Sequence, residues 1–446
     1  MTKLKKMPKT PKVKFLRAIK GVSSDMLNYS TEIKKTLGDT AQIDLGYLQL
    51  YASSNADFIK YVLQTNQKNY GKSRAYNALK LGLGNGLVTS KGSFWRKQRR
   101  LAQPVFYKKN LENLFQDMGR STTEFLEYLE GKRGTTIDIS REMMNVTATI
   151  VLRALFNVEQ SESLDQIYKS MDVTQEYLMK IIGNPIMQPW YKINGEEKKF
   201  YNAIKDLDQL VYTIMNNRRD SQEKKNDLLQ MLMDAEDADT GEKMTDLQLR
   251  DELVTLFSAG HETSSNALSW TFYLLCKNPE TIQKLRAGIN EKLPDQRMPS
   301  FQDLRELTYT RQGIEEGMRI YPPAWIIGRR ALEDDEFNGF AIKKDVNMLL
   351  EIYGMHHSTT YWENPEAFNP DRFSPEVAKK RPKHHYLPFG AGPRMCIGNH
   401  FAMMEMQLLL ATIMQRFDFE LDVNHVVEVD PLITLRPKNG ILLKVK

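Results

Sequence analysis

Apolar residues recur every three or four positions over long stretches of the chain, which is the spacing of one face of an α-helix. Between residues 43 and 51 apolar and polar residues alternate, which predicts an early β-hairpin. The stretch 66–92 has little periodicity and is predicted to be a long functional loop. Helices are predicted at 24–37, 94–104, 111–129, 139–156, 161–182, 196–219, 228–235, 245–277, 301–320 and 401–417, with turns at 183–185 and 221–226.

The last third of the chain is mixed, with short strands separated by Pro-Pro and Asn-Gly pairs and a final strand at 440–445. The predicted fold class is therefore mainly α with a smaller β-rich lobe. The 446 residues contain no linker rich in Gly, Ser or Pro. We expect a basic N-terminal tail, residues 1–22, followed by a single domain, residues 23–446.

Charge and cysteine content narrow the functional classes. The net charge of +6 is mild and the lysines are scattered, so no nucleic-acid partner is predicted. Two cysteines, Cys276 and Cys396, cannot build a disulfide framework or a multi-cysteine metal site, which predicts a reducing, cytoplasmic location. No apolar run near the N-terminus is long enough for a signal peptide or a membrane anchor.

The most informative chemistry lies in residues 389–398, Phe-Gly-Ala-Gly-Pro-Arg-Met-Cys-Ile-Gly. Cys396 precedes an apolar helix, whose first backbone N–H groups can stabilise a thiolate. Gly392 and Gly398 would let the backbone approach a flat macrocycle, and Arg394 could reach an acidic group on it. These features suit a haem iron with a cysteine axial ligand, although a lone cysteine is more often an inert buried thiol.

A second unusual segment, Ala259-Gly260-His261-Glu262-Thr263, falls inside the longest predicted helix. Gly260 costs about 1 kcal/mol there relative to alanine, and it leaves room for a small ligand against the backbone. The Thr263 hydroxyl can hydrogen-bond a bound oxygen molecule and pass on a proton that Glu262 supplies. The alternative is a solvated kink, with His261 and Glu262 facing water.

Residues 389–398 resemble the haem-binding signature of the cytochromes P450, and residues 259–263 are similar to the oxygen-activating segment of that family. The resemblance implies the cytochrome P450 fold of the soluble, bacterial type. It also implies haem b (iron protoporphyrin IX) as cofactor and O₂ as co-substrate. The five signature positions hold Phe389, Gly392, Arg394, Cys396 and Gly398, and the haem contacts are expected to include Gly390, Ala259 and Gly260.

The resemblance extends to a charge network. Glu316 and Arg319, three apart on one helix face, are similar to the Glu-x-x-Arg pair of the family. Arg372, in Pro-Asp-Arg-Phe, is similar to the arginine that joins this pair in a buried network, from which removal of one partner costs about 3–5 kcal/mol. These three residues are expected to assemble the haem pocket and not to take part in the chemistry.

Trp95 and Arg99, four apart on a predicted helix, resemble the pair that holds a haem propionate in this family. Gln98 stands where many members have histidine, which leaves the local hydrogen bonding open. Arg329 resembles a further propionate-binding arginine, and its neighbour Arg330 is the alternative.

The implied activity is that of a haem-thiolate monooxygenase, which inserts one oxygen atom of O₂ into a C–H bond of a small organic substrate. The product would arise by hydroxylation or by oxidative O-dealkylation, including demethylation. Because no flavin or iron–sulfur domain is fused to the chain, we expect a ferredoxin or flavodoxin with an NAD(P)H reductase as electron donors. The alternatives are a peroxide-driven haem-thiolate peroxygenase and a non-catalytic haem-binding sensor.

Basic residues before the Cys396 loop and in the early helices could form a docking face for an acidic electron-transfer protein, or be ordinary surface charge. They are Arg96, Lys97, Arg100, Lys108, Lys109, Lys379, Lys380, Arg381 and Lys383.

The predicted substrate pocket includes Leu87, His261, Trp325 and Ile326, together with the rest of the stretch 324–327. Its apolar members suggest an apolar site, whereas polar residues such as His261 could hydrogen-bond an oxygenated ligand. A fatty acyl chain, a terpenoid and a methoxylated or otherwise polar small molecule all remain open.

Overall fold

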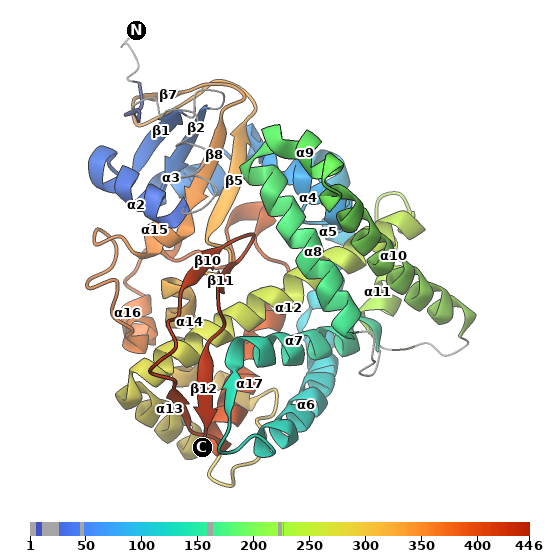
Figure 1. Cartoon of the computed structure of the whole chain (residues 1–446), viewed down its shortest axis with the longest axis vertical. Helices are drawn as coiled ribbons and strands as arrows, with labels where there is room; N and C mark the ends of the chain where they lie inside the picture. Colours follow the sequence, from blue (N-terminus) through green and yellow to red (C-terminus); the bar gives the residue numbers. More distant parts are fainter. Residues whose placement is uncertain (1–5, 11–25, 45–48, 158–163, 222–224, 226) are drawn as a thin grey trace.

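The computed structural model of the chain describes residues 6–10, 26–44, 49–157, 164–221, 225 and 227–446. A β-rich lobe occupies the upper left of Figure 1, and helices form most of the rest of the molecule. One long helix, α12 (Asp246–Lys277), crosses the middle of the molecule. The fold is therefore mainly α with a smaller β-rich lobe, as the sequence predicts.

The main sheet of the β-rich lobe joins segments from both ends of the chain, in the order β1-β2-β8-β5-β3. The predicted hairpin is present as β1 (Thr40–Asp44) and β2 (Gln49–Ser53), which pair antiparallel. β2 lies parallel to β8 (Asn347–Glu351), β8 pairs antiparallel with β5 (Ile326–Ala331), and β3 (Tyr70–Lys72) lies at the edge.

α12 forms the centre of the helical part. It begins with a capping box, in which Thr245 Oγ1 accepts a hydrogen bond from Gln248 N at 3.3 Å and Gln248 Oε1 accepts one from Thr245 N at 2.8 Å. Most of its residues are buried, because α7 (Ile139–Phe156), α14 (Thr308–Ile320) and α17 (Asn399–Arg416) pack around it. A helix covered on so many sides is held rigidly, which suits a scaffold for a site.

The remaining elements surround this centre. The helices are α2 (Met26–Leu37), α3 (Ala56–Lys60), α4 (Ala75–Leu83), α5 (Gly92–Ala102), α6 (Lys108–Glu130), α8 (Leu164–Gly183), α9 (Gln188–Ile193), α10 (Glu196–Asp220), α11 (Leu228–Asp234), α13 (Pro279–Lys292), α15 (Ile352–His356) and α16 (Pro375–Ala378). Smaller sheets contain β4 (Thr136–Asp138), β6 (Asp335–Phe337), β7 (Phe340–Ile342), β9 (Phe419–Leu421), β10 (Val429–Pro431), β11 (Leu435–Pro437) and β12 (Leu442–Val445).

Two predictions of local structure are wrong. The stretch 66–92 is not a long loop, because it contains β3 and α4, and β3 forms only by pairing with the distant β5. Residues 301–320 do not form one helix, since a short 3₁₀ turn at 303–305 precedes α14. The first residues of the helices predicted at 24–37 and 161–182, and most of the turn predicted at 221–226, lie outside the described residues.

Part of the predicted basic tail packs on the β-rich lobe. Met7 is buried, and Lys9 forms a parallel bridge with Gln42 of β1. Lys9 Nζ also lies 2.6 Å from Asp44 Oδ2. Residues 6–10 thus belong structurally to the domain, while the rest of the tail, up to residue 22, lies outside the described residues.

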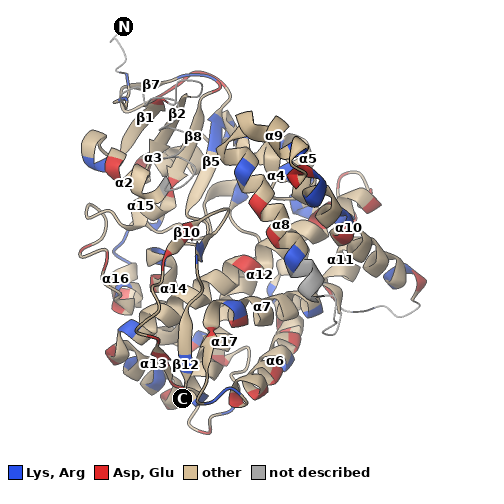
Figure 2. Cartoon of the chain, in the orientation of Figure 1, with Lys and Arg blue, Asp and Glu red and all other residues tan. Residues whose placement is uncertain are grey.

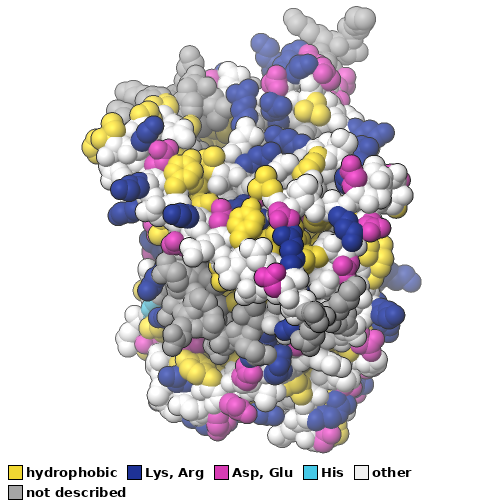
Figure 3. Space-filling model, turned by 90° about the vertical axis from the view of Figure 1, so that its right-hand side faces the viewer, with side chains coloured by type: hydrophobic (Ala, Val, Ile, Leu, Met, Phe, Trp, Pro, Cys, Tyr) yellow, Lys and Arg dark blue, Asp and Glu magenta, His cyan; other side chains and the backbone are white. Residues whose placement is uncertain are grey.

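Charged side chains are spread over the surface. Lys and Arg alternate with Asp and Glu along α6, α8 and α10 (Figure 2). The face in Figure 3 also mixes basic, acidic and apolar side chains. Such mixing is the pattern of a solvated surface.

Candidate active site

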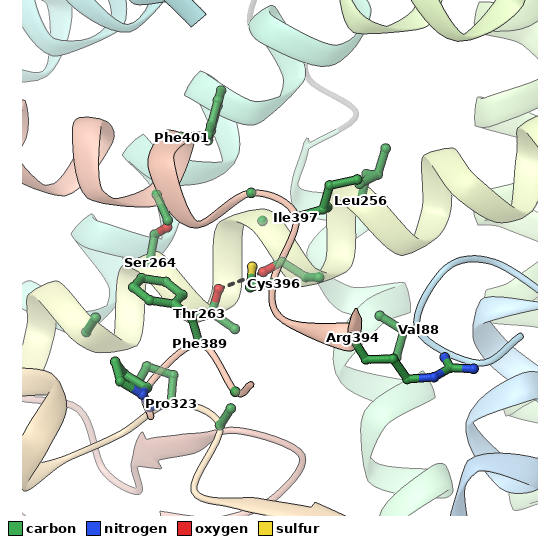
Figure 4. A pocket seen from close by; sticks show the side chains of 18 of the residues that line it. Val88, Leu256, Thr263, Ser264, Pro323, Phe389, Arg394, Cys396, Ile397 and Phe401 are labelled. Carbon is green, nitrogen blue, oxygen red and sulfur yellow. Dashed lines mark hydrogen bonds between the residues drawn. The ribbon is translucent and has the colours of Figure 1, made fainter. Parts of the chain in front are cut away.

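A cavity of about 330 Å³ lies between α12 and the segment 388–402. Thr263 of α12 and Cys396 of that segment both border it (Figure 4). The residues that α12 contributes share one face of the helix, because they follow one another at helical spacing. They are Leu256, Ala259, Gly260, Thr263, Ser264 and Ala267.

The Cys396 thiol lies in the interior, with exposed surface where the residue borders the cavity. The loop that carries it is closed by a hydrogen bond from Cys396 N to Phe389 O at 2.9 Å, and α17 begins three residues later, at Asn399. Burial raises the pKa of the thiol, while the backbone N–H of Gly398 and the charge of Arg99 act in the opposite direction. A metal cation at the cavity would favour the thiolate further.

Gly392 is required in this loop for a different reason from the one predicted. Gly390 and Gly392 have φ of +69° and +70°, which favours glycine. A side chain at Gly392 would overlap the backbone carbonyl of Leu63, so this glycine allows close packing of two protein segments and not the approach of a macrocycle. Gly390 and Gly398 do border the cavity, as does Phe389.

One end of the cavity is strongly cationic. Lys72, Arg329 and Arg394 all border it. Burial and the neighbouring Arg329 and Arg394 hold the pKa of Lys72 well below its usual range, and burial with Arg329 lowers the pKa of Arg394 to about 10. Among the described residues, none of the three cations has a carboxylate within ion-pair distance. The cluster therefore fits an anionic group, such as the two carboxylates of protoporphyrin IX.

Sequence reasoning missed Lys72. It lies in β3, inside the stretch taken for a loop, and no motif surrounds it. Its side chain also covers the ring of Tyr76, with Nζ 4.1 Å from the ring centroid. Only the pairing of β3 with β5 brings Lys72 opposite Arg329, so no local signal could have identified it.

Trp95 and Arg99 lie behind the cationic end and do not border the cavity. The Arg394 guanidinium stacks on Trp95, and Arg99 Nη1 donates to Met395 O at 2.8 Å. Gln98 between them is fully buried, and its amide has no hydrogen-bond partner among the described residues. Direct contact of Trp95 and Arg99 with a propionate remains a prediction.

Thr263 and Glu262 face different surroundings. Thr263 Oγ1 borders the cavity and donates to Ala259 O at 2.7 Å. Glu262 is buried behind it, where Oε1 accepts from Thr434 Oγ1 at 2.6 Å and Oε2 accepts from Gln175 Nε2. Burial raises the pKa of Glu262. The solvated kink is thereby wrong, since His261 is buried as well.

Leu87, His261, Trp325 and Ile326 do not border this cavity. Ala324 and Ile327 of the predicted stretch 324–327 do border it, as does Val88, the neighbour of Leu87. His261 turns to another side of α12, where it stacks on Phe257 and its Nδ1 lies 2.7 Å from Phe257 O. Trp325 is buried elsewhere, with Nε1 donating to Leu432 O at 3.0 Å. Successive side chains alternate between the faces of a strand, so in β5 Ile327 borders the cavity and Ile326 does not. In the turn that follows α4, Val88 borders the cavity and Leu87 does not.

Glu316 binds both arginines of the predicted charge network. Its Oε2 accepts from Arg319 Nε at 2.7 Å, and its Oε1 lies 3.3 Å from Arg372 Nε. Arg319 Nη1 also donates to the backbone carbonyl of His356 at 2.9 Å. Glu316 and Arg319 are fully buried, so the network ties α14 to the segment that leads to the Cys396 loop.

Three basic residues of the predicted docking face are paired with carboxylates or packed on aromatic rings. Arg381 is held between the rings of Trp362 and Phe373, Lys97 pairs with Glu242, and Arg100 pairs with Asp237. The remaining members are exposed, namely Arg96, Lys108, Lys109, Lys379, Lys380 and Lys383.

A cysteine that borders a cavity with a cationic end defines a site for an iron porphyrin with a thiolate ligand. The model of the cytochrome P450 family matches residues 8–445, and the chain belongs to this family. Its members are haem-thiolate monooxygenases that use O₂ and take electrons from redox partners. Within the described residues, no helix is long and apolar enough to cross a membrane.

Relatives whose names state a function are distant in sequence. Cyclooctatin synthase of Streptomyces melanosporofaciens is 31% identical over 85% of this chain and 83% of its own length. Protein LUTEIN DEFICIENT 5, chloroplastic, of Arabidopsis thaliana is 27% identical over 93% of this chain and 72% of its own length. Cytokinin hydroxylase of the same plant is 29% identical, with coverages of 88% and 78%. These similarities show the family and leave the substrate open.

Proposed function

We propose that this chain binds haem b and inserts one oxygen atom of O₂ into a C–H bond of a small, apolar organic substrate. The observation that carries the proposal is that Cys396 and Thr263 border one cavity whose other end is cationic. A thiolate ligand, a hydroxyl for proton transfer and a carboxylate-binding end are the three features that this chemistry requires.

The residues of the cavity fit the parts of a haem. Cys396 would ligate the iron, and Lys72, Arg329 and Arg394 would bind the two carboxylates. Trp95 and Arg99 would support that end from behind, through Arg394 and the backbone of Met395. When bound, the haem supplies the binding and reductive activation of O₂, and the protein supplies position, electrostatics and protons.

Protons would be supplied first by Glu262 and then through Thr263. Glu262 is a buried acid whose raised pKa keeps a proton available, and Gln175 and Thr434 hold its two oxygens. Thr263 borders the cavity and would pass the proton on to a ligand there. Its hydroxyl hydrogen is donated to Ala259 O, so the hydroxyl would have to rotate toward the cavity for this step.

The lining of the cavity favours an apolar substrate among the alternatives. Away from the cationic end and Thr263, the wall consists of side chains such as Val88, Val151, Leu256 and Ile327. An oxygenated ligand would lose hydrogen bonds to water there without replacing them. Hydroxylation of an apolar carbon is thus the first expectation, with O-dealkylation or demethylation as a second outcome where that carbon bears oxygen.

We propose a ferredoxin or a flavodoxin with an NAD(P)H reductase as the electron source, and a cytoplasmic location. Exposed lysines such as Lys379, Lys380 and Lys383 precede the Cys396 loop in the chain and support an acidic partner. The two cysteines are free thiols, which accords with a reducing compartment.

The test combines one spectrum with one turnover assay. The reduced, CO-treated holoprotein should show the absorption band of thiolate-ligated haem, and Cys396→Ser should lose it. With surrogate redox partners, NADH consumption should follow the loss of an apolar substrate. Product formed from peroxide alone would instead indicate a peroxygenase, and a thiolate band without any turnover would indicate a sensor.

A further inference from the structure

Two adjacent carboxylates of α12, Asp251 and Glu252, are buried outside the catalytic constellation. Their residues are only 5% and 1% exposed. Glu252 lies on the same face of α12 as Leu256, Ala259 and Thr263, which border the cavity. It does not itself border the cavity, because residues 84–90, here called the 84–90 loop, pass over it.

Both carboxylates bind backbone N–H groups of the 84–90 loop. Asn85 N donates to Asp251 Oδ2 at 2.7 Å, and Leu87 N donates to Glu252 Oε2 at 3.0 Å. Hydrogen bonds from N–H groups to a carboxylate are stronger than those between neutral groups. Two such bonds, two residues apart, hold this loop to the helix along its length.

The glycines of the loop make this approach possible. Gly84 has φ of +64°, and a side chain there would overlap the carboxylate of Asp251. A side chain at Gly86 would overlap the hydroxyl of Thr255, one turn further along α12. The loop is also closed on itself, since Thr89 Oγ1 donates to Gly84 O at 2.6 Å.

The loop reaches the cavity on its other side. Val88 borders the cavity, and Ser90 O accepts a hydrogen bond from Arg394 Nη1 at 3.1 Å. In Figure 4, Arg394 extends away from Cys396 toward Val88. Any shift of the 84–90 loop would therefore move part of the apolar wall and one of the cations at the carboxylate-binding end.

We propose that Asp251 and Glu252 are positioning residues that hold the 84–90 loop closed as a wall of the cavity, and so control ligand entry and the retention of substrate. This role rests on the proposed function only in that the cavity receives haem and substrate.

The two carboxylates differ in their other hydrogen bonds. Asp251 Oδ1 accepts from Arg250 Nη1 at 2.9 Å, and Arg250 Nε donates to Asp208 Oδ1 of α10, so Asp251 is anchored in a charge network. Glu252 Oε1 has no hydrogen-bond partner among the described residues.

The first experiment follows the loop in the holoprotein. Glu252→Met removes the acceptor at similar size, whereas Glu252→Gln keeps one. We expect amide hydrogen exchange in residues 84–90 to accelerate at least about tenfold in Glu252→Met and to stay near the wild-type rate in Glu252→Gln, because the glutamine oxygen can still accept from Leu87 N whereas methionine leaves this N–H without an acceptor. Asp246→Asn, in the exposed first turn of α12 and paired with Arg219, is the control.

The second experiment uses imidazole, which binds haem iron from the cavity and shifts the Soret band. Its association and dissociation rates, measured by stopped flow, should both rise about fivefold or more in Glu252→Met. Gly86→Ala places a side chain against Thr255 and so pushes the 84–90 loop away from α12 beside the Glu252 contact. It should reproduce both effects, which keeps the test valid should Glu252→Met fold poorly. Faster exchange throughout the protein, or unchanged exchange and imidazole rates in a folded variant, would overturn the proposal. Hydrogen exchange remains informative even if the thiolate band is absent and the proposed function fails.

Discussion

The Arg394 guanidinium lies over the indole ring of Trp95, with Cζ 4.1 Å from the ring centre. This contact joins the loop of Cys396 to α5 and leaves the charge of Arg394 directed at the cavity, beside Arg329 and Lys72. A positively charged group that stacks on an aromatic ring is held in place without being neutralised. The arrangement prepares the cavity for an anion before any cofactor binds.

Lys72 should therefore matter for haem retention. Lys72→Met removes one of three cations and is expected to speed the transfer of haem to excess apomyoglobin about tenfold. A factor of this size corresponds to the loss of one charged hydrogen bond. Lys80→Met, at an exposed position of α4, is the matched control. Equal transfer rates for Lys72→Met and wild type would show that Lys72 does not hold a carboxylate.

Thr263→Ala should separate electron consumption from product formation. Without the hydroxyl, proton delivery slows and reduced oxygen escapes as peroxide, so product per NADH is expected to fall about tenfold or more. Thr263→Ser, which keeps a hydroxyl, should retain most of the coupling. The measurement is NADH oxidation, peroxide and product in one assay; full coupling in Thr263→Ala would remove Thr263 from the proton path.

Glu316→Gln should destabilise the protein strongly. It leaves Arg319, which is fully buried, and Arg372 without their carboxylate, at an expected cost of about 3–5 kcal/mol. Asp371→Asn breaks only the exposed pair with Lys284 and should cost less than about 1 kcal/mol. Urea unfolding followed by tryptophan fluorescence compares the two, and similar midpoints would contradict the central role of Glu316.

Stability should fall as the pH rises from about 4.5 to about 7 because of Glu252. Burial raises its pKa from 4.5 to about 7, so the folded protein keeps a proton that the unfolded chain releases in this range. The loss amounts to about 3 kcal/mol from this residue alone. Glu252→Gln cannot titrate and should reduce the slope of unfolding free energy against pH; an unchanged slope would show that Glu252 is ionised in the folded protein.

Glu405 should extend the loss of stability with rising pH to higher pH values. Burial raises its pKa to about 8, and it lies beside Ser264 of the cavity wall. Glu405→Gln is therefore expected to remove a further loss of stability between pH 7 and 8. Thermal unfolding at several pH values, with the Glu252→Gln variant in parallel, separates the two contributions.

Local patterns predicted most helices, since helical periodicity needs no knowledge of distant residues. They failed at residues 66–92, where β3 exists only through its pairing with β5. They also failed for the side chains that line the cavity. Of the predicted stretch 324–327, Ile327 borders the cavity and Ile326 does not, and Val88 borders it in place of Leu87, because adjacent side chains point in different directions.

The sequence by itself determined the family and placed the residues that are predicted to carry its chemistry, because the Cys396 loop and the segment around Thr263 are contiguous motifs whose spacing can be read without the fold. The tertiary structure decided which cations meet at the cavity, which face of α12 borders it, and that Glu262 and Glu252 are buried in separate polar contacts. Such features depend on burial and on contacts between residues far apart in the chain, which set the hydrogen-bond partners and the pKa of each group.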